Sequence, residues 1–446
     1  MSPDPTPHQD GMLVDESELV ETVSGPMTDS LVWATWALFV GLGLMLAGAG
    51  VFATLIAVRT ELDGFRPVEI GLVSGAYFLG FLVGSRLTLR FLVAVGHIRS
   101  YSALASLLSV SILTAAYVTS PLAWILLRLL AGACLAGQYV VAESWLNQIV
   151  SSQRRGRLLS IYTTLTVFAF GAGQFGFTRF DPREVTGFVV AALLISAAVV
   201  PVSLSVDAAP PIIAAPEHMS LRELWALVPT GVVTSFLVGL AQGGFAGLSA
   251  VYATRAGLSS TATGLFVAMP ALGSLLISVP VTAASDGRDR RIVGSLAAIA
   301  AAGGAVVLSL AAFDSWVAFG AMAVIGGMSY PLYSIAGAYT NDWVPTSKLT
   351  AVAGQLVLLY GAGAFLGPLL ASTMMTEEGI VGYPRAIAVT HLTVAVYLIV
   401  RIAQHRPADR AKPWNAVPVA GRFLLLPPTV VSMGRRLRPS RRRARP

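Results

Sequence analysis

The sequence predicts an all-α polytopic membrane protein with twelve transmembrane helices in two six-helix bundles. Of its 446 residues, 55% are hydrophobic and only 12% are charged, which is unlike a soluble protein of this length. The hydrophobic residues come in runs of about 20, the length of helix that spans a bilayer. A polar, proline-rich stretch at 207–223 divides these runs into two sets of six, because a bilayer does not accept such a stretch as a span.

Taken in order, the first six spans are expected at about 31–58, 68–92, 100–118, 121–147, 157–177 and 185–205. The second six are expected at about 224–253, 262–284, 292–312, 315–340, 349–375 and 385–403. Residues 31–206 and 224–404 therefore form the two bundles, and 207–223 form a cytoplasmic linker. Residues 1–30 are acidic and contain no lysine or arginine, so we predict a disordered tail rather than a signal peptide. Residues 405–446 form a basic tail rich in proline and arginine.

The distribution of basic residues predicts that both termini are cytoplasmic. With the N-terminus inside, the cytoplasmic loops contain Arg86, Arg90, Arg99, Arg154, Arg155, Arg157, Arg222, Arg288, Arg290, Arg291 and Lys348. The opposite loops contain only Arg59, Arg66, Arg179, Arg183, Arg255 and Arg385. Cytoplasmic loops carry the excess of basic residues, so the larger set marks the cytoplasmic side. The charge of the basic tail suits anionic lipid or nucleic acid; we expect the lipid bilayer and no nucleic acid, because the tail follows a span directly.

The segment Leu126–Ser160 carries two charges inside a predicted span. Arg128 falls within the hydrocarbon, where a charge costs roughly 2.5 to 3.5 kcal/mol, so such a charge usually faces a protein interior or a wet cavity. Glu143 is the next acidic residue of this span, roughly 22 Å further along the helix. The partner of Arg128 must therefore be a carbonyl group, another helix or a substrate. A pathway through the membrane is the first hypothesis.

The two halves also show a weak internal repeat. Phe170-Gly171-Ala172-Gly173 and Tyr360-Gly361-Ala362-Gly363 lie at the same place in the fifth and eleventh spans. Trp145 and Trp343 each close the preceding span beside a carboxylate, Glu143 or Asp342. Two repeats related by an axis along the membrane normal place a binding site between them at mid-depth.

Three motifs, AESWLN at 142–147, SDGRDRR at 285–291 and AYTNDW at 338–343, resemble the YcaD-like branch of the major facilitator superfamily. The resemblance covers Leu31–Gln404, and Arg128 with Gly132 match the Arg-x-x-x-Gly pattern of the fourth helix in this superfamily. The charged loop after the eighth helix is similar too, but its first-half counterpart, 95–99, contains no acidic residue. The resemblance implies the major facilitator fold, alternating access and a bacterial cytoplasmic membrane.

The resemblance also implies roles for individual residues. A cytoplasmic gate is expected from Asp286, Arg288, Arg290, Arg291, Glu143, Arg154, Arg155 and Arg157. The arginines around Asp286 either latch the closed state or only set topology, and Glu143 makes a structural ion pair with the basic loop or is a proton site. Helices one, four, seven and ten line the cavity, which gives the substrate-contact candidates Arg128, Gln138, Gln242, Tyr330 and Tyr333. Helix packing is expected from Gly132, Gly171, Gly173, Gly361, Gly363, Gly367 and Pro368.

Enzyme signatures are absent from the sequence. It contains no phosphate-binding Gly-x-x-x-x-Gly-Lys-Ser/Thr, no His-Glu-x-x-His and a single cysteine, so we expect no catalysis, metal or other cofactor. We expect a monomeric secondary transporter of an unknown small molecule, coupled to protons, with Glu143, Asp342 and His391 as the buried titratable candidates. A facilitator without ion coupling, a lipid-translocating protein of the same fold and a membrane sensor or scaffold are the alternatives.

Overall fold

The computed structural model describes residues 27–149, 155–205 and 219–404, and all regular structure in these ranges is helical. The first half contains α2 (Met27–Leu62), α3 (Pro67–Val95), α4 (His97–Tyr117), α5 (Pro121–Ile149), α6 (Arg155–Gly176) and α7 (Thr186–Ser203). The second half contains a short α8 (Leu221–Leu227), then α9 (Pro229–Arg255), α10 (Ser260–Asp286), α11 (Arg290–Leu310), α12 (Trp316–Trp343), α13 (Leu349–Glu378) and α14 (Gly382–Gln404). Each of the twelve predicted spans corresponds to one long helix, which confirms the predicted fold class.

Two helix starts differ from the prediction by four or more residues. Helix α2 begins at Met27, inside the predicted tail. The seventh span begins at Pro229 rather than near 224, because Ser220 starts a separate short helix: its hydroxyl accepts from the Glu223 amide (3.2 Å), and the Glu223 carboxylate accepts from the Ser220 amide (3.0 Å). Pro229 then suits the first position of α9, where its missing N–H is not needed. Most of the predicted tails, most of the linker and Arg154 lie outside the described residues.

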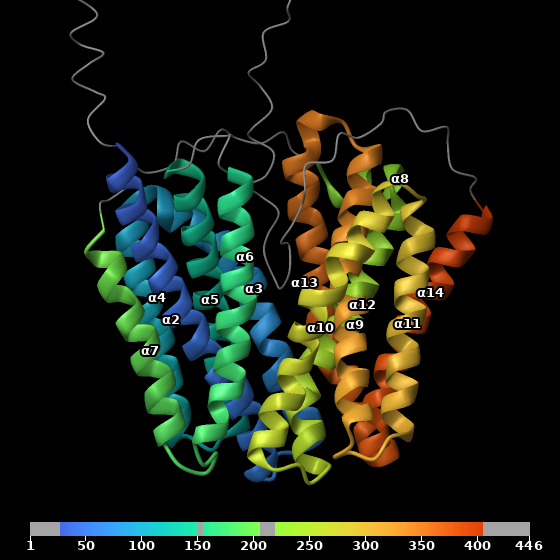
Figure 1. Cartoon of the computed structure of the whole chain (residues 1–446), viewed down its shortest axis with the longest axis horizontal. Helices are drawn as coiled ribbons and strands as arrows, with labels where there is room; N and C mark the ends of the chain where they lie inside the picture. The colour runs from blue at the N-terminus through green and yellow to red at the C-terminus, as the bar shows by residue number, and fades with distance from the viewer. Residues whose placement is uncertain (1–26, 150–154, 206–218, 405–446) are drawn as a thin grey trace, which may run out of the picture.

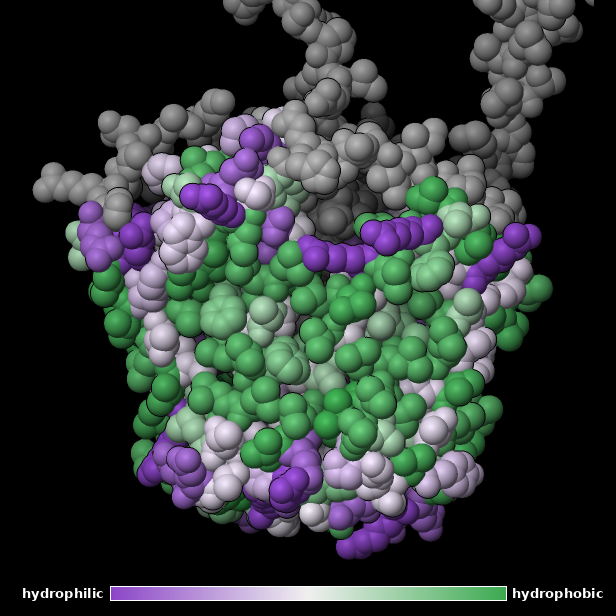
Figure 2. Space-filling model, turned by 180° about the vertical axis from the view of Figure 1, so that it is seen from behind, coloured by the Kyte–Doolittle hydropathy of each residue, from purple (hydrophilic) through white to green (hydrophobic). Residues whose placement is uncertain are grey.

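The two halves stand side by side and approach each other most closely at one end (Figure 1). Helix α2 begins and α14 ends at the opposite end, which we call the terminus side; the end where the halves meet is the far side. A belt of hydrophobic surface separates two hydrophilic ends (Figure 2). Exposed valine, leucine and phenylalanine side chains such as Val110, Phe168 and Leu276 contribute to the apolar surface of the helices. Ten helical stretches among the described residues are long and apolar enough to cross a membrane, one of them containing both α13 and α14. The chain is a multi-pass membrane protein.

Glycines set the closest helix crossings. A Cβ at Gly132 would press on the carbonyl group of Tyr77, so this glycine lets α5 reach the backbone of α3. Gly173 lies in the same way against Ala47 of α2, and Gly363 against Phe236 of α9. The α2–α6 crossing of the first half therefore has a counterpart in the α9–α13 crossing of the second, as the repeat predicts.

The other predicted packing residues on α6 and α13 behave differently from one another. Gly367 also lies against α9, at the carbonyl of Leu240, and Pro368 lies close to Gly247 of α9. Gly361 faces Leu82 across the two halves, and a Cβ there would lie 3.3 Å from the Leu82 side chain, a tight contact that requires this side chain to shift slightly. A Cβ at Gly171 would meet nothing within 4 Å. The packing prediction is wrong for Gly171. Positions two residues apart on a helix point to nearly opposite faces, so Gly171 points away from the helix that Gly173 contacts.

Candidate functional site

A cavity lies between the two halves. It offers about 120 Å³ to the centres of water-sized molecules, several times the roughly 10 to 15 Å³ that one water needs. Helices α2, α3, α4, α5 and α6 line it from the first half, and α9, α10, α12 and α13 from the second. Its polar and aromatic lining residues include Phe52, Tyr77, Phe78, Arg128, Phe170, Gln174, Gln242, Phe245, Tyr330 and Tyr360. The cavity is therefore shared by both bundles.

Contacts between the halves close the cavity on the far side. The Arg255 guanidinium at the end of α9 pairs with the Glu61 carboxylate at the end of α2, with Nε to Oε1 at 2.8 Å. Ser74 of α3 donates a hydrogen bond to the carbonyl oxygen of Gly247 on α9, at 3.0 Å. Gly264 near the start of α10 lies against Thr178, just after α6. The ion pair and the Ser74 hydrogen bond both lie on the far side.

Arg128 reaches the cavity wall because of the way α5 crosses α3. Arg128 and Gly132 are four residues apart and share one face of α5. Gly132 brings this face against the backbone of Tyr77, and the Arg128 guanidinium then lies over the Tyr77 ring, 4.7 Å from its centroid. Phe52 of α2 lies on another side, with its centroid 5.4 Å away. The Arg-x-x-x-Gly spacing thus has a physical role: the glycine permits the crossing that positions the arginine.

The guanidinium of Arg128 has no ionic partner among the described residues. It is 8% exposed, and it makes no hydrogen bond or ion pair with any other residue in the described part of the chain. The two rings contribute about 0.5 to 2 kcal/mol each as cation–π partners. They leave the positive charge uncompensated, and they do not satisfy its N–H donors. Arg128 therefore gives the cavity wall a net positive charge.

A hydrogen-bond network extends from the cavity into the second half. Tyr360 donates from its hydroxyl to Gln242 Oε1 (2.9 Å), and Gln242 Nε2 donates to the carbonyl oxygen of Ser329 (2.6 Å). His391 Nδ1 lies 2.8 Å from the carbonyl oxygen of Ile387, and its Nε2 lies 2.9 Å from the Ser329 hydroxyl. A carbonyl only accepts, so the neutral imidazole carries its proton on Nδ1 and accepts from Ser329. His391 is thus held by two hydrogen bonds and is fully buried behind the cavity wall.

The structure brings together three of the five predicted cavity residues, Arg128, Gln242 and Tyr330. Tyr330 packs on Phe245 with ring centroids 5.5 Å apart. The cavity lining does not include Gln138 or Tyr333. Gln138 is fully buried within α5, and its amide atoms have no hydrogen-bond partner among the described residues. Tyr333 lies one turn beyond Tyr330 and packs on the Tyr360 ring, 4.7 Å away, so it supports the wall from behind.

Sequence reasoning missed Tyr77, Phe52 and Gln174 as cavity residues. Tyr77 and Phe52 are two aromatic residues among many in apolar spans, and their sequence positions carry no sign that they contact Arg128. Gln174 of α6 lines the cavity, and its side chain makes no hydrogen bond within the described part of the chain. The signal available in the sequence was that Gln174 is a polar residue directly after Gly173, within a predicted span.

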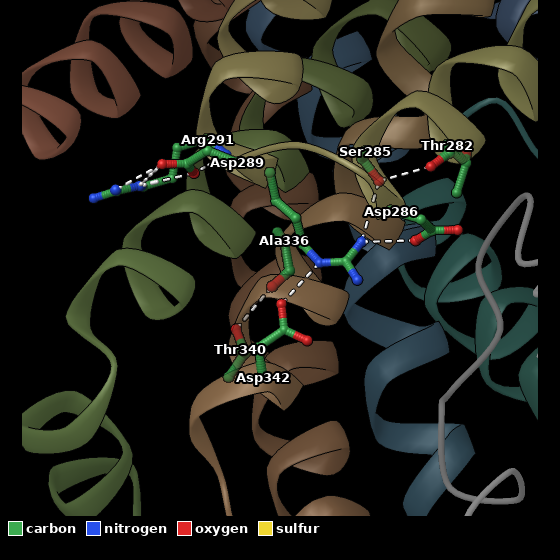
Figure 3. A network of polar contacts seen from close by, with 9 residues as sticks. Thr282, Ser285, Asp286, Asp289, Arg291, Ala336, Thr340 and Asp342 are labelled. Carbon is green, nitrogen blue, oxygen red and sulfur yellow. Dashed lines mark hydrogen bonds and ion pairs between the residues drawn. The ribbon is translucent and has the colours of Figure 1, made fainter. Parts of the chain in front are cut away.

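The predicted gate after α10 forms an ion-pair network within the second half (Figure 3). Arg290 Nη1 lies 3.0 Å from Asp286 Oδ1, and its Nε lies 2.9 Å from Asp342 Oδ2. Arg291 Nη2 lies 2.8 Å from Asp289 Oδ2, and its Nη1 donates to the carbonyl oxygen of Arg401 on α14. Both arginines are at most 7% exposed, so they hold α10, α11, α12 and α14 together on the terminus side.

The remaining charged residues singled out in the sequence lie in different settings. Arg288 is exposed and makes no hydrogen bond or ion pair in the described part of the chain. Asp342 was expected to be buried, but its side chain is 42% exposed and is paired to Arg290, because α12 ends at the surface one residue later. Glu143 is buried and accepts a hydrogen bond from the Tyr162 hydroxyl at 3.3 Å. Arg154 lies outside the described residues, and pairing of Glu143 with Arg154, Arg155 or Arg157 stays a prediction.

Comparisons with known proteins agree with this geometry. The family model described as Major Facilitator Superfamily matches residues 37–333 and 231–438. An uncharacterised MFS-type transporter of Enterobacter sp. (strain 638) is 25% identical over 351 residues, covering 76% of this chain and 88% of that protein. The MFS-type transporter YcaD of Escherichia coli O7:K1 is 26% identical over 345 residues, covering 75% of this chain and 87% of its own.

Solved structures show the same fold at low sequence identity. The nucleoside transporter NupG superposes with a TM-score of 0.66 at 13% identity, covering 84% of this chain and 99% of that one. A bacterial homologue of the human lysosomal transporter Spinster superposes with a TM-score of 0.65 at 16% identity, covering 85% of this chain and 96% of that one.

Proposed function

Because the chain belongs to the major facilitator superfamily, we propose that it moves a small molecule across a membrane by alternating access. The observation that carries this proposal is the cavity between the halves, lined from both and closed by contacts on the far side. A protein that only senses or scaffolds has no need of a cavity shared by two similar bundles. The Arg128 guanidinium and the Gln174 amide in the lining favour a small polar-headed solute over a lipid.

Alternating access requires that the far-side contacts break at modest cost. Arg255 and Glu61 are 23% and 20% exposed, so their pair is partly hydrated. Partly exposed pairs contribute about 0.2 to 1 kcal/mol, and one neutral hydrogen bond adds about 0.5 to 1.5 kcal/mol. These are small terms, so a state open to the far side can have a free energy close to that of the observed state.

Distance measurements between spin labels test the proposal without knowledge of the substrate. Cys134 is first changed to serine, because it is the single cysteine. One pair of labels, on Arg90→Cys and Ser347→Cys, reports the terminus side; the other, on Arg179→Cys and Thr261→Cys, reports the far side. All four positions are exposed. We expect each pair to show two distances in membranes. Conditions that shorten the distance within one pair should lengthen the distance within the other. A single unchanging distance for both pairs contradicts transport and favours a scaffold.

We also propose that the protein lies in a bacterial cytoplasmic membrane with both termini in the cytoplasm. The excess of arginine in the loops on the terminus side supports this orientation. A fluorescent protein and alkaline phosphatase, each fused after Gln404, test it in cells. We expect fluorescence and no phosphatase activity; the reverse result contradicts the orientation.

We further propose proton coupling. Glu143 supports it, because an acidic side chain kept 8% exposed in a membrane bundle is suited to reversible protonation. The far-side label pair should change its distance populations between about pH 5 and pH 8, and Glu143→Gln should remove this response while His391→Gln preserves it. Distance populations that do not respond to pH would contradict proton coupling and favour a facilitator without ion coupling.

A further inference from the structure

We propose that the cavity binds an organic anion with an apolar body, whose carboxylate pairs with Arg128. This inference rests on the proposed function, because it names the substrate class of the same cavity. Arg128 is the single charged residue in the described lining, which contains no aspartate, glutamate, lysine or histidine. The charge of the cavity is therefore positive, with nothing in its wall to offset it.

The state of Arg128 indicates a ligand rather than a structural ion pair. Its guanidinium is more than nine-tenths buried at the wall, and no carboxylate in the described part of the chain neutralises it. The nearest acidic residues along α5 and at the end of α2 are otherwise engaged: Glu143 with Tyr162, and Glu61 with Arg255. A planar guanidinium binds a carboxylate through two parallel N–H···O bonds. One bound carboxylate would supply both the missing charge and the missing acceptors.

The number of positive charges limits the ligand to a monoanion. A phosphate ester with two negative charges would keep one of them uncompensated in a largely apolar cavity. An organic cation would meet Arg128 with no acidic residue to hold it. The lining thus selects by charge as well as by size.

The rest of the lining defines the body of the ligand. Seven aromatic rings face the cavity: Phe52, Tyr77, Phe78, Phe170, Phe245, Tyr330 and Tyr360. Alanine and valine make up nearly half of the remaining lining residues. Flat apolar bodies pack well on such rings. The Gln174 amide, which has no hydrogen bond within the described part of the chain, is available for one hydroxyl or amide group on the body.

A matched series of ligands tests the proposal on the purified full-length protein. The probes are benzoate, 3-phenylpropionate and 4-phenylbutyrate, with 4-phenylbutylamine and 4-phenylbutanol as the cationic and neutral counterparts of the last. Binding is measured by calorimetry and by the shift in thermal unfolding. We expect at least one carboxylate to bind at least tenfold more tightly than the alcohol, and the amine to bind more weakly than both. If none of the carboxylates binds at millimolar concentration, or the amine binds best, the proposal is overturned.

Variants of Arg128 separate ligand binding from a structural role. Arg128→Gln should lower carboxylate affinity at least tenfold and leave the affinity of the alcohol within twofold. Arg128→Lys should retain part of the preference for the carboxylate. Arg385→Gln is the matched control, since this exposed arginine pairs with Glu378 and neither residue lines the cavity. Equal loss of alcohol and carboxylate binding in Arg128→Gln would show a structural role alone and overturn the proposal.

The outcome is distinguishable from failure of the proposed function. Spin labels that show two states with no carboxylate binding would overturn the substrate class and retain transport. Carboxylate binding by a protein that shows a single conformational state would retain the substrate class and overturn transport.

Discussion

Replacing Gly132 by alanine should weaken the first bundle and displace Arg128. A Cβ at this position would lie within 3.0 Å of the carbonyl carbon of Tyr77 and at 3.0 Å from the Phe81 amide nitrogen. The carbonyl oxygen of Tyr77 would lie closer still. Ordinary contacts are about 3.5 to 4.0 Å, so α5 and α3 must separate by more than about 1 Å. The atoms in the way are backbone atoms, which cannot turn aside as a flexible side chain can. The crossing that places Arg128 over Tyr77 would therefore open.

The size of the effect follows from two opposing terms. Overpacking of this kind costs about 1 to 3 kcal/mol, and glycine to alanine in a helix returns about 0.5 to 1 kcal/mol. We expect a net loss of about 1 to 2 kcal/mol in the free energy of unfolding, and weaker carboxylate binding. Gly171→Ala is the matched control, because a Cβ there meets nothing within 4 Å. It should be neutral or slightly stabilising.

Equilibrium unfolding in mixed detergent micelles measures both variants against the same parent. If Gly171→Ala destabilises the protein as much as Gly132→Ala, the loss of stability comes from replacing any glycine in these helices and not from crowding at the α3–α5 crossing. If Gly132→Ala is neutral, then α3 and α5 adjust freely and the explanation of the Arg-x-x-x-Gly spacing is refuted.

Further predictions concern the ion pairs on each side. Asp286→Asn and Asp342→Asn should each lower the free energy of unfolding by about 1 kcal/mol, because both carboxylates are over one-third exposed. The double variant should lower it by about 3 kcal/mol or more, because it leaves the buried Arg290 without a carboxylate. Additive losses in a double-mutant cycle, measured by unfolding in detergent, would contradict the shared pairing. Asp286→Asn should also slow carboxylate flux into proteoliposomes while the protein stays inserted and folded, and flux at the parent rate would rule out the latch. Glu61→Arg or Arg255→Glu should lengthen the distances between the far-side labels, and the double variant should restore the parent distances. Equal distances in the parent, both single variants and the double variant would show that this ion pair does not hold the far side closed.

The fold was predictable because each span is a long apolar run bounded by turn residues. The boundary near α8 was missed although Ser220 and Glu223 form a recognisable capping box, since the apolar run from Leu224 onward dominated the interpretation. Gly171 was grouped with Gly173 because both belong to one repeated motif. Only the facing helix shows which of the two contacts it.

The cavity was predictable in part. Arg128 stands out in the sequence because a charge within a span needs a reason. Its contacts with Tyr77 and Phe52 depend on the register of three helices, which no local pattern specifies. The same holds for Gln138, whose side chain lies outside the cavity although α5 lines it. The side on which the halves close is not encoded in any single motif, since both states use the same residues at similar free energies.

Accessibility of one cavity residue from each side of the membrane tests alternating access most directly. Ala246 lines the cavity and is exposed, so Ala246→Cys in the Cys134→Ser background can report on it through a membrane-impermeant thiol reagent applied to oriented vesicles. We predict modification from both sides, and loss of modification from the far side alone once Glu61→Cys and Arg255→Cys are crosslinked. Modification from one side only, unchanged by the crosslink, would contradict a cavity that opens to each side in turn.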